Sequence, residues 1–261
     1  IHENDSDSAL GENKLFITRD TDIAVLNDTG ANTWNLNWWV TTKSQAALRT
    51  GVPHPGVYFP SLRISIIGDG NKIHTIDKNG AVTNTRLTLP VFLRAEYIFT
   101  TTRRVWILCS NTLGGNGAII EWDGYTETYN NLHDAYSRSP LSGVNWREIP
   151  IIINDKGIIL EYTGNGFTPM IRSGQKVSFP IAIEAGNFFS LVTDDIGISR
   201  RGMTISEDGL IYINASDAYT ASSRHNGGIW CLNPETGRFY KKYSIGQWGN
   251  HFGEQLLDIA G

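Results

Sequence analysis

Cysteine is nearly absent from this chain of 261 residues, which has only Cys109 and Cys231. Two cysteines so far apart form neither a disulfide framework nor the paired ligands of a zinc site. Both lie in apolar, strand-like runs, VWILCS and GIWCLN. Because free cysteine is among the most often buried residues, we expect two buried free thiols.

Charge is also scarce, since Asp, Glu, Lys and Arg make up 18% of the residues and the formal net charge is −4. The basic pairs Arg103-Arg104, Arg200-Arg201 and Lys241-Lys242 form no continuous stripe, so specific nucleic-acid binding is not expected. General contact with DNA along a lumen stays open. A hydrophobic content of 40% is nevertheless enough for a sizeable core, which excludes wholesale disorder.

Long apolar runs are missing. Runs such as Ile149 to Ile153 are far too short to span a bilayer, so no membrane span is expected. The chain has no secretory apolar segment and begins with Ile rather than Met. We therefore expect a processed or excised piece of a longer protein.

Helical periodicity is absent as well, and a unit of three short strands recurs instead. Its turns are of the Asn-Gly and Asp-Gly kind, which supply the positive φ angles that hairpins need. The copies are 15–36, 64–89, 105–129, 150–171 and 210–243. In the third copy, the third strand is expected at Tyr125–Tyr129.

This repeat predicts an all-β fold, a single β-propeller of five blades, because the first copies recur every 40–50 residues or so. The last spacing is longer, which implies an insertion near 172–200 or a degenerate sixth blade there. A blade usually has four strands. The expected inner strands are Val57–Phe59, Ala95–Phe99, Val144–Trp146 and Gly202–Ile205.

The first copy has no convincing inner strand before it. We expect residues 254–260 to supply that strand, so that the N- and C-terminal strands pair and close the ring. The predicted organisation is a polar N-terminal segment, 1–13, followed by the propeller, 14–261. A β-sandwich is the alternative, although it does not require a repeated unit with similar turns.

If a propeller of this kind were an enzyme, glycoside hydrolysis would be the first reaction to consider. That reaction needs two carboxylates facing a sugar. The candidates are Glu96, Glu121, Asp123, Glu161 and Asp208. The chain has no Asp-Pro motif of the five-bladed glycosidases. Asp28–Trp34 misses the sialidase Asp-box spacing, as does Ser206–Gly209. There is no Gly-x-Ser-x-Gly elbow, although a Ser/His/Asp triad stays open because its members need not be close in sequence. We predict no catalytic residue.

Metal and cofactor sites are not expected either. The histidines lack zinc-type spacing, and GDGN, with Asp69, lacks the regular acidic spacing of a calcium loop. Asp77 is a further loop carboxylate. The turns GNGFT and LGGNG are not followed by Lys-Ser/Thr, so they are not phosphate cradles. The histidines are His2, His54, His74, His133, His225 and His251.

Aromatic residues are plentiful, with 8 Trp, 10 Tyr and 10 Phe. Trp38-Trp39 and Tyr125…Tyr129 could form a sugar-stacking or protein-contact surface. We favour the alternative that they pack between blades, because aromatic side chains dominate core burial.

The segment Gly143-Val144-Asn145-Trp146-Arg147-Glu148-Ile149, continuing through IIINDKGIILEYTGNGF, resembles the propeller domains of phage tail-nozzle and related virion proteins. Three later stretches are similar to these propeller domains in the same way: residues 196–202, DGLIYINAS and GGIWCLNPETGRFY. The resemblance implies a structural protein and carries over no catalytic residue.

We therefore expect a non-enzymatic structural or interaction module of a virion or phage tail, making protein–protein contacts in a larger assembly. The loops 40–56, 131–142 and 172–200 would contact neighbouring subunits, which are other virion proteins or further copies of the chain. A carbohydrate-binding propeller, with a surface glycan as partner, and a glycoside hydrolase are the alternatives.

Overall fold

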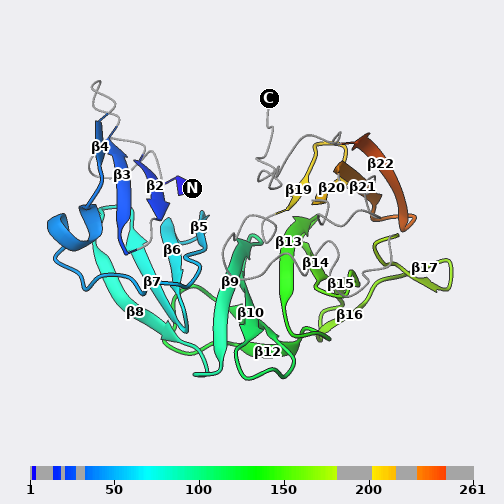
Figure 1. The fold of residues 1–261 in the computed structure, drawn as a ribbon, viewed down its shortest axis with the longest axis horizontal. Helices are drawn as coiled ribbons and strands as arrows, with labels where there is room; N and C mark the ends of the chain where they lie inside the picture. Colours follow the sequence, from blue (N-terminus) through cyan, green and yellow to red (C-terminus); the bar gives the residue numbers. More distant parts are fainter. Residues whose placement is uncertain are drawn as a thin grey trace, which may run out of the picture. The chain divides into compact units, whose positions relative to one another are not determined.

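The computed structural model describes residues 2–3, 14–18, 21–27, 33–180, 202–215 and 228–244. It divides into two compact units, Ile1–His133 and Asp134–Gly261. The described residues form six antiparallel sheets, five of four strands and one of two (Figure 1). The expectation of an all-β fold is confirmed, and the only helical turn among these residues is a short π-helix, η1 (Trp38–Thr42).

The first unit contains three of the four-stranded sheets, in each of which every strand pairs with its neighbour in the sequence. β1 contacts β5, and β5 contacts β9, so the first strands of successive sheets are neighbours. The strands are β1 (His2–Glu3), β2 (Lys14–Thr18), β3 (Ile23–Asn27), β4 (Thr33–Asn35), β5 (Gly56–Phe59), β6 (Ile64–Asp69), β7 (Lys72–Asp77), β8 (Val82–Thr88), β9 (Leu93–Thr100), β10 (Val105–Asn111), β11 (Ala118–Trp122) and β12 (Asn131–Asp134).

The second unit has two four-stranded sheets, again with sequential strand order, and the first strands β13 and β19 are in contact. A two-stranded hairpin, β17–β18, lies between them in the sequence. The strands are β13 (Pro140–Trp146), β14 (Ile149–Asn154), β15 (Ile159–Tyr162), β16 (Phe167–Pro169), β17 (Ile171–Arg172), β18 (Gln175–Lys176), β19 (Met203–Ile205), β20 (Ile211–Ala215), β21 (Gly228–Asn233) and β22 (Arg238–Ser244).

The hairpins close as the turn residues predict. Between β7 and β8, the Asp77 carboxylate accepts hydrogen bonds from the amides of Asn79 (2.9 Å) and Ala81 (2.7 Å). Gly80 follows with φ +74°, a conformation that other residues rarely adopt. Asn154 plays the same part between β14 and β15, where its side-chain oxygen accepts from Lys156 N and Ile158 N.

The core lies where the middle strands are covered on both faces. In β10, the run Val105–Ser110 is buried throughout. A strand with one face exposed to water would instead alternate buried and exposed residues, so both faces of β10 are covered. Cys109 lies in the core of the first unit and Cys231 is buried in β21, so the prediction of buried free thiols is confirmed. Burial raises the pKa of both thiols.

Strands are present where inner strands were predicted, as β5, β9, β13 and β19, and each stands at one edge of its four-stranded sheet. The third strand expected at Tyr125–Tyr129 is wrong, because the outer strand of that sheet is β12, at Asn131–Asp134. The Asp123 carboxylate accepts hydrogen bonds from Tyr125 N and Thr126 N, so these amides close a turn and are not available to a strand ladder.

The ends of the repeat differ from expectation or lie outside the described residues. The polar segment 1–13 was expected to lack a strand, but β1 pairs with Leu15 and Phe16 of β2. Such pairing uses main-chain groups, so it does not need an apolar run. The closing strand expected at 254–260 lies outside the described residues, and β1 takes the place beside β2 that was predicted for it. Residues 181–201, which cover most of the predicted insertion, also lie outside the described residues.

Candidate interaction surface

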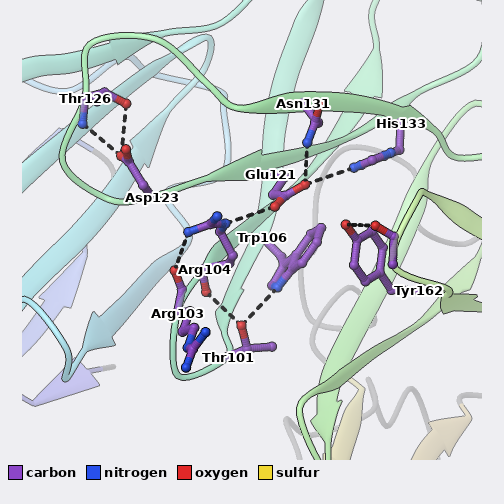
Figure 2. A network of polar contacts seen from close by, with 11 residues as sticks. Thr101, Arg103, Arg104, Trp106, Glu121, Asp123, Thr126, Asn131, His133 and Tyr162 are labelled. Atoms are coloured by element: carbon purple, nitrogen blue, oxygen red, sulfur yellow. Dashed lines mark hydrogen bonds and ion pairs between the residues drawn. The ribbon is translucent and has the colours of Figure 1, made fainter.

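A buried carboxylate organises one end of the β9–β12 sheet (Figure 2). Glu121, in β11, accepts a hydrogen bond on Oε1 from Arg104 Nε (2.9 Å) and on Oε2 from Asn131 Nδ2 (2.8 Å). His133 Nε2 lies 3.5 Å from the same Oε2. Its ring packs near the indole of Trp106, with 6.2 Å between centroids. These contacts fasten the turn before β10 and the outer strand β12 to β11.

The same contacts fix the charge of Glu121. Burial alone would raise the pKa of this carboxyl, but hydrogen bonds from Asn131, Arg104 and His133 outweigh burial and lower it. A general acid that works near neutral pH needs a raised pKa. Glu121 is therefore suited to holding the turn and strand in place and not to protonating a leaving group.

The other candidate carboxylates are also held by their own donors. Glu96 is buried and accepts from Arg94 Nε (2.8 Å) and the Ser110 hydroxyl. Glu161 takes two hydrogen bonds from the Arg172 guanidinium, at 2.9 and 2.8 Å, which raise the pKa of Arg172.

Asp208 lies in the exposed turn between β19 and β20. It accepts a hydrogen bond from the Ser206 hydroxyl, which lowers the pKa of this carboxyl. Asp123, the last of the five, shapes a loop on the surface of the first unit.

The Asp123 loop is rigidly built. Asp123 Oδ1 accepts from Tyr125 N (2.8 Å), Thr126 N (2.8 Å) and Thr126 Oγ1 (2.9 Å). Burial would raise the pKa of Asp123, but these hydrogen bonds outweigh it and lower the pKa. Gly124 has φ +80°, and a Cβ there would lie 2.9 Å from ring carbons of Phe59. Only glycine lets the loop pack this closely.

This loop presents Tyr125, which is 66% exposed. Arg86, on β8, donates from Nε to Tyr125 O (2.6 Å), and its guanidinium lies 4.8 Å from the centre of the Tyr125 ring. Such a cation–π contact adds to the hydrogen bond in fixing the ring. Tyr125 is thus an exposed aromatic side chain held on both sides of its Cα, by Asp123 through the backbone and by Arg86.

Two neighbouring turns complete the patch. Leu62, an exposed residue of the β5–β6 turn, lies against Gly124, and the exposed Arg103 lies in the β9–β10 turn. The Ser61 hydroxyl donates to Thr102 O and so joins these two turns. We call Leu62, Arg86 and Tyr125 the Tyr125 surface, and the turn that carries Arg103 lies beside it.

The aromatic residues divide between the two interpretations of the sequence. Trp38 and Trp39 are buried, and Trp39 Nε1 donates to Ala46 O (2.9 Å), so packing is confirmed for them. Tyr129 also packs against the core of the first unit. For Tyr125 the prediction of packing is wrong, because its side chain is exposed. The Asp-Gly turn directly before Tyr125 could have indicated that this side chain is exposed. The pairing of Tyr125 with Arg86 has no local sequence signal.

The described histidines and loop carboxylates do not gather into a metal centre. No group of three His, Cys, Asp or Glu in the described ranges could hold a metal ion. His54 and His74 flank the buried Asp69, at 3.5 and 3.6 Å, and Asp69 also accepts from Arg49 N (2.9 Å). His225 and His251 lie outside the described residues. Among the residues that can be described, no helix is long and apolar enough to cross a membrane.

Comparison with known proteins bears on the fold of the chain and not on its function. No family model matches the chain, and no curated protein matches it. Its structure is similar to PorZ, a surface component of the Porphyromonas gingivalis type-IX secretion system, with a TM-score of 0.54 and 10% identity over 94% of this chain and 28% of PorZ. The extracellular domain of a hybrid two-component system from B. thetaiotaomicron gives a TM-score of 0.53 and 12% identity, covering 83% of this chain and 26% of that one.

A computationally designed protein gives a TM-score of 0.51 and 12% identity, covering 92% of this chain and 60% of the design. The chain thus spans roughly a quarter of the length of the first two structures and under two thirds of the third. At such low identity these likenesses show a shared fold and say nothing about activity.

Proposed function

We propose that the chain is a non-enzymatic interaction module, built on a five-bladed β-propeller, within a larger assembly. The five four-stranded sheets, each of strands consecutive in sequence, support the propeller. Within each unit the first strands of successive sheets are neighbours, as the inner strands of blades are.

The observation that carries the function is the fixed exposure of Tyr125. Tyr and Arg are enriched at the centres of protein interfaces. A side chain that is already ordered loses little conformational entropy on binding, so Arg86 and Asp123 prepare Tyr125 for a contact. Arg86 uses Nε for Tyr125 O, and its planar Nη groups suit a partner carboxylate. The partner surface we infer is acidic.

The non-enzymatic part of the proposal is supported by the candidate carboxylates, each of which is engaged by its own donors. The assignment to a virion or phage tail follows from the sequence resemblance at 143–149 and 196–202. The partners would be other proteins of that assembly or further copies of the chain. A surface glycan is the alternative partner of the Tyr125 surface.

Site-specific crosslinking tests this proposal. A photoreactive phenylalanine analogue at Tyr125, in the full-length protein within its assembly, should crosslink to a second polypeptide. The matched control is Leu36, which is about half exposed in the same unit and lies outside the loops expected to contact neighbouring subunits. Equal crosslinking at both positions, or none at Tyr125, would contradict the proposed contact.

A glycan panel tests the alternatives. Binding of a neutral or acidic glycan that Tyr125→Ala abolishes would favour carbohydrate recognition over a protein contact. Hydrolysis that is lost in Glu121→Gln while the fold is retained would overturn the non-enzymatic proposal.

A further inference from the structure

An apolar tip stands at the other end of the β9–β10 hairpin. It consists of Val91 and Phe92, in the turn between β8 and β9, and Leu113, in the turn between β10 and β11. Their exposed fractions are 85%, 38% and 81%. Thr112 donates from N (2.9 Å) and from Oγ1 (3.1 Å) to Phe92 O, so the two turns form one surface. We call Val91, Phe92 and Leu113 the apolar tip.

The tip is separate from the Tyr125 surface. Leu93 pairs with Asn111 next to the tip, and Thr100 pairs with Val105 next to the Arg103 turn. The two features therefore lie at opposite ends of the same strand pair, about 20 Å apart at 3.3 Å per residue. A ligand of one does not occupy the other.

No charge lies near the tip in the sequence. There is no charged residue between Arg86 and Arg94, and none between Arg104 and Glu121. Arg94 itself is paired with the buried Glu96. In space, Lys72 pairs with Thr88 across β7 and β8, and Arg49 lies against Gly70 in the β6–β7 turn beside the tip. When the tip enters an apolar environment, these two cations would stay at its polar surface.

Part of the backbone of the tip is bonded internally. Leu93 N donates to Pro90 O (2.9 Å), Leu113 N to Asn111 Oδ1 (2.9 Å), and Gly114 N to Asn111 O (3.5 Å). Asn111 Nδ2 in turn donates to Asn116 O (2.9 Å). Each such bond lowers the cost of bringing the loop into the apolar boundary of a bilayer.

These features together select one occupant. Three side chains are too little surface for a stable dimer, which needs about 800 Å² from each partner. The tip also lacks the Tyr, Trp and Arg that mark protein hot spots. A lipid surface needs neither shape complementarity nor hydrogen bonds from a partner. We propose that the apolar tip inserts into the acyl boundary of a lipid bilayer and attaches the chain to it weakly and reversibly.

This inference goes beyond the protein contact proposed above and is tested independently of it. The probe is a vesicle of pure phosphatidylcholine, whose net charge is zero. Leu113→Cys, labelled with an environment-sensitive dye, should gain fluorescence when vesicles are added. Cys109 and Cys231 are buried and stay unlabelled in the folded chain. The same dye on Leu132→Cys, elsewhere in the unit, should not respond.

Flotation of the unlabelled chain with these vesicles measures binding. Replacing two exposed apolar side chains in Val91→Asn/Leu113→Asn should weaken partitioning by at least about tenfold. Leu132→Asn is the matched control and should float like the wild type. Because all three positions are exposed, unchanged circular dichroism should accompany each variant.

Three results would overturn the inference. The wild-type chain could fail to float, or the double variant could float equally well. Binding only to anionic vesicles, lost at high salt, would indicate an electrostatic contact instead. If the double variant disturbs the protein assembly while the wild type ignores vesicles, the tip fits a protein pocket. Tyr125→Ala should leave flotation unchanged, which separates this test from that of the proposed function.

Discussion

Replacing Glu121 by Gln should destabilise the chain measurably. The substitution keeps the shape of the side chain but removes the charge that Arg104, Asn131 and His133 contact. One side-chain oxygen also becomes an NH2 group, which cannot accept from these donors. Hydrogen bonds to a charged group contribute about 1.5–3 kcal/mol, and breaking a fully buried ion pair costs about 3–5 kcal/mol.

The exposure of the partners decides the magnitude. The Arg104 side chain is 41% exposed, so water can solvate it once the carboxylate is gone. The loss should therefore lie near the lower figure, about 2 kcal/mol at neutral pH. Urea unfolding followed by tryptophan fluorescence measures it. Glu127→Gln changes an exposed residue of the loop that follows β11. It is the control and should change stability by less than about 0.5 kcal/mol.

The pH dependence gives a second, sharper readout. The pKa of Glu121 is lowered in the fold, so its contribution is fully present above the unfolded-state pKa of about 4.3 and is lost as pH falls through the folded-state value. The stability difference between wild type and Glu121→Gln should be constant from pH 6 to 8, or thereabouts, and shrink below about pH 4. A difference under about 0.5 kcal/mol, or one that does not shrink in acid, would refute the reasoning.

The remaining predictions concern the loop, the thiols and the buried aspartate. Gly124→Ala should cost about 1–3 kcal/mol in urea unfolding, because its methyl group meets Phe59 in a left-handed backbone; an unchanged midpoint would contradict the close packing. Cys109 and Cys231 should resist a thiol reagent in the native chain and both react in urea without reductant; rapid native labelling would show that the strands are misplaced. Asp69→Asn should cost about 2 kcal/mol or more by removing the charge between two buried histidines, as a thermal midpoint lowered by several degrees would show.

The repeated hairpins could be predicted because their information is local. Strand β14 follows from a run of Ile, and β7 follows from a short run that includes the β-branched residues Ile73 and Ile76. The turns after them follow from Asp77-Lys78-Asn79-Gly80 and Asn154-Asp155-Lys156-Gly157. Only the third strand of one copy was misplaced. There, Tyr125–Tyr129 has a composition suited to a strand. The amides of Tyr125 and Thr126 instead donate to the Asp123 carboxylate and form a turn.

The surfaces could not be predicted in the same way. Arg86 meets Tyr125 from a strand far away in the sequence, so no local pattern indicates the pair. Val91 and Phe92 belong to the run LTLPVFL, whose composition is typical of a buried strand. Their exposure follows from the turn that Pro90 begins, where Leu93 N bonds to Pro90 O, and from the partner turn at Leu113.

The sequential order of strands has a consequence for how the chain is made. Within each four-stranded sheet, every strand pairs with the one synthesised just before or after it. Such short-range pairing costs little loop-closure entropy and favours rapid folding. The ladder of β5 to β8 can therefore be complete before β9 leaves the ribosome. Each finished sheet then offers an apolar face on which the next can condense, so few unpaired edges are exposed to aggregation during synthesis.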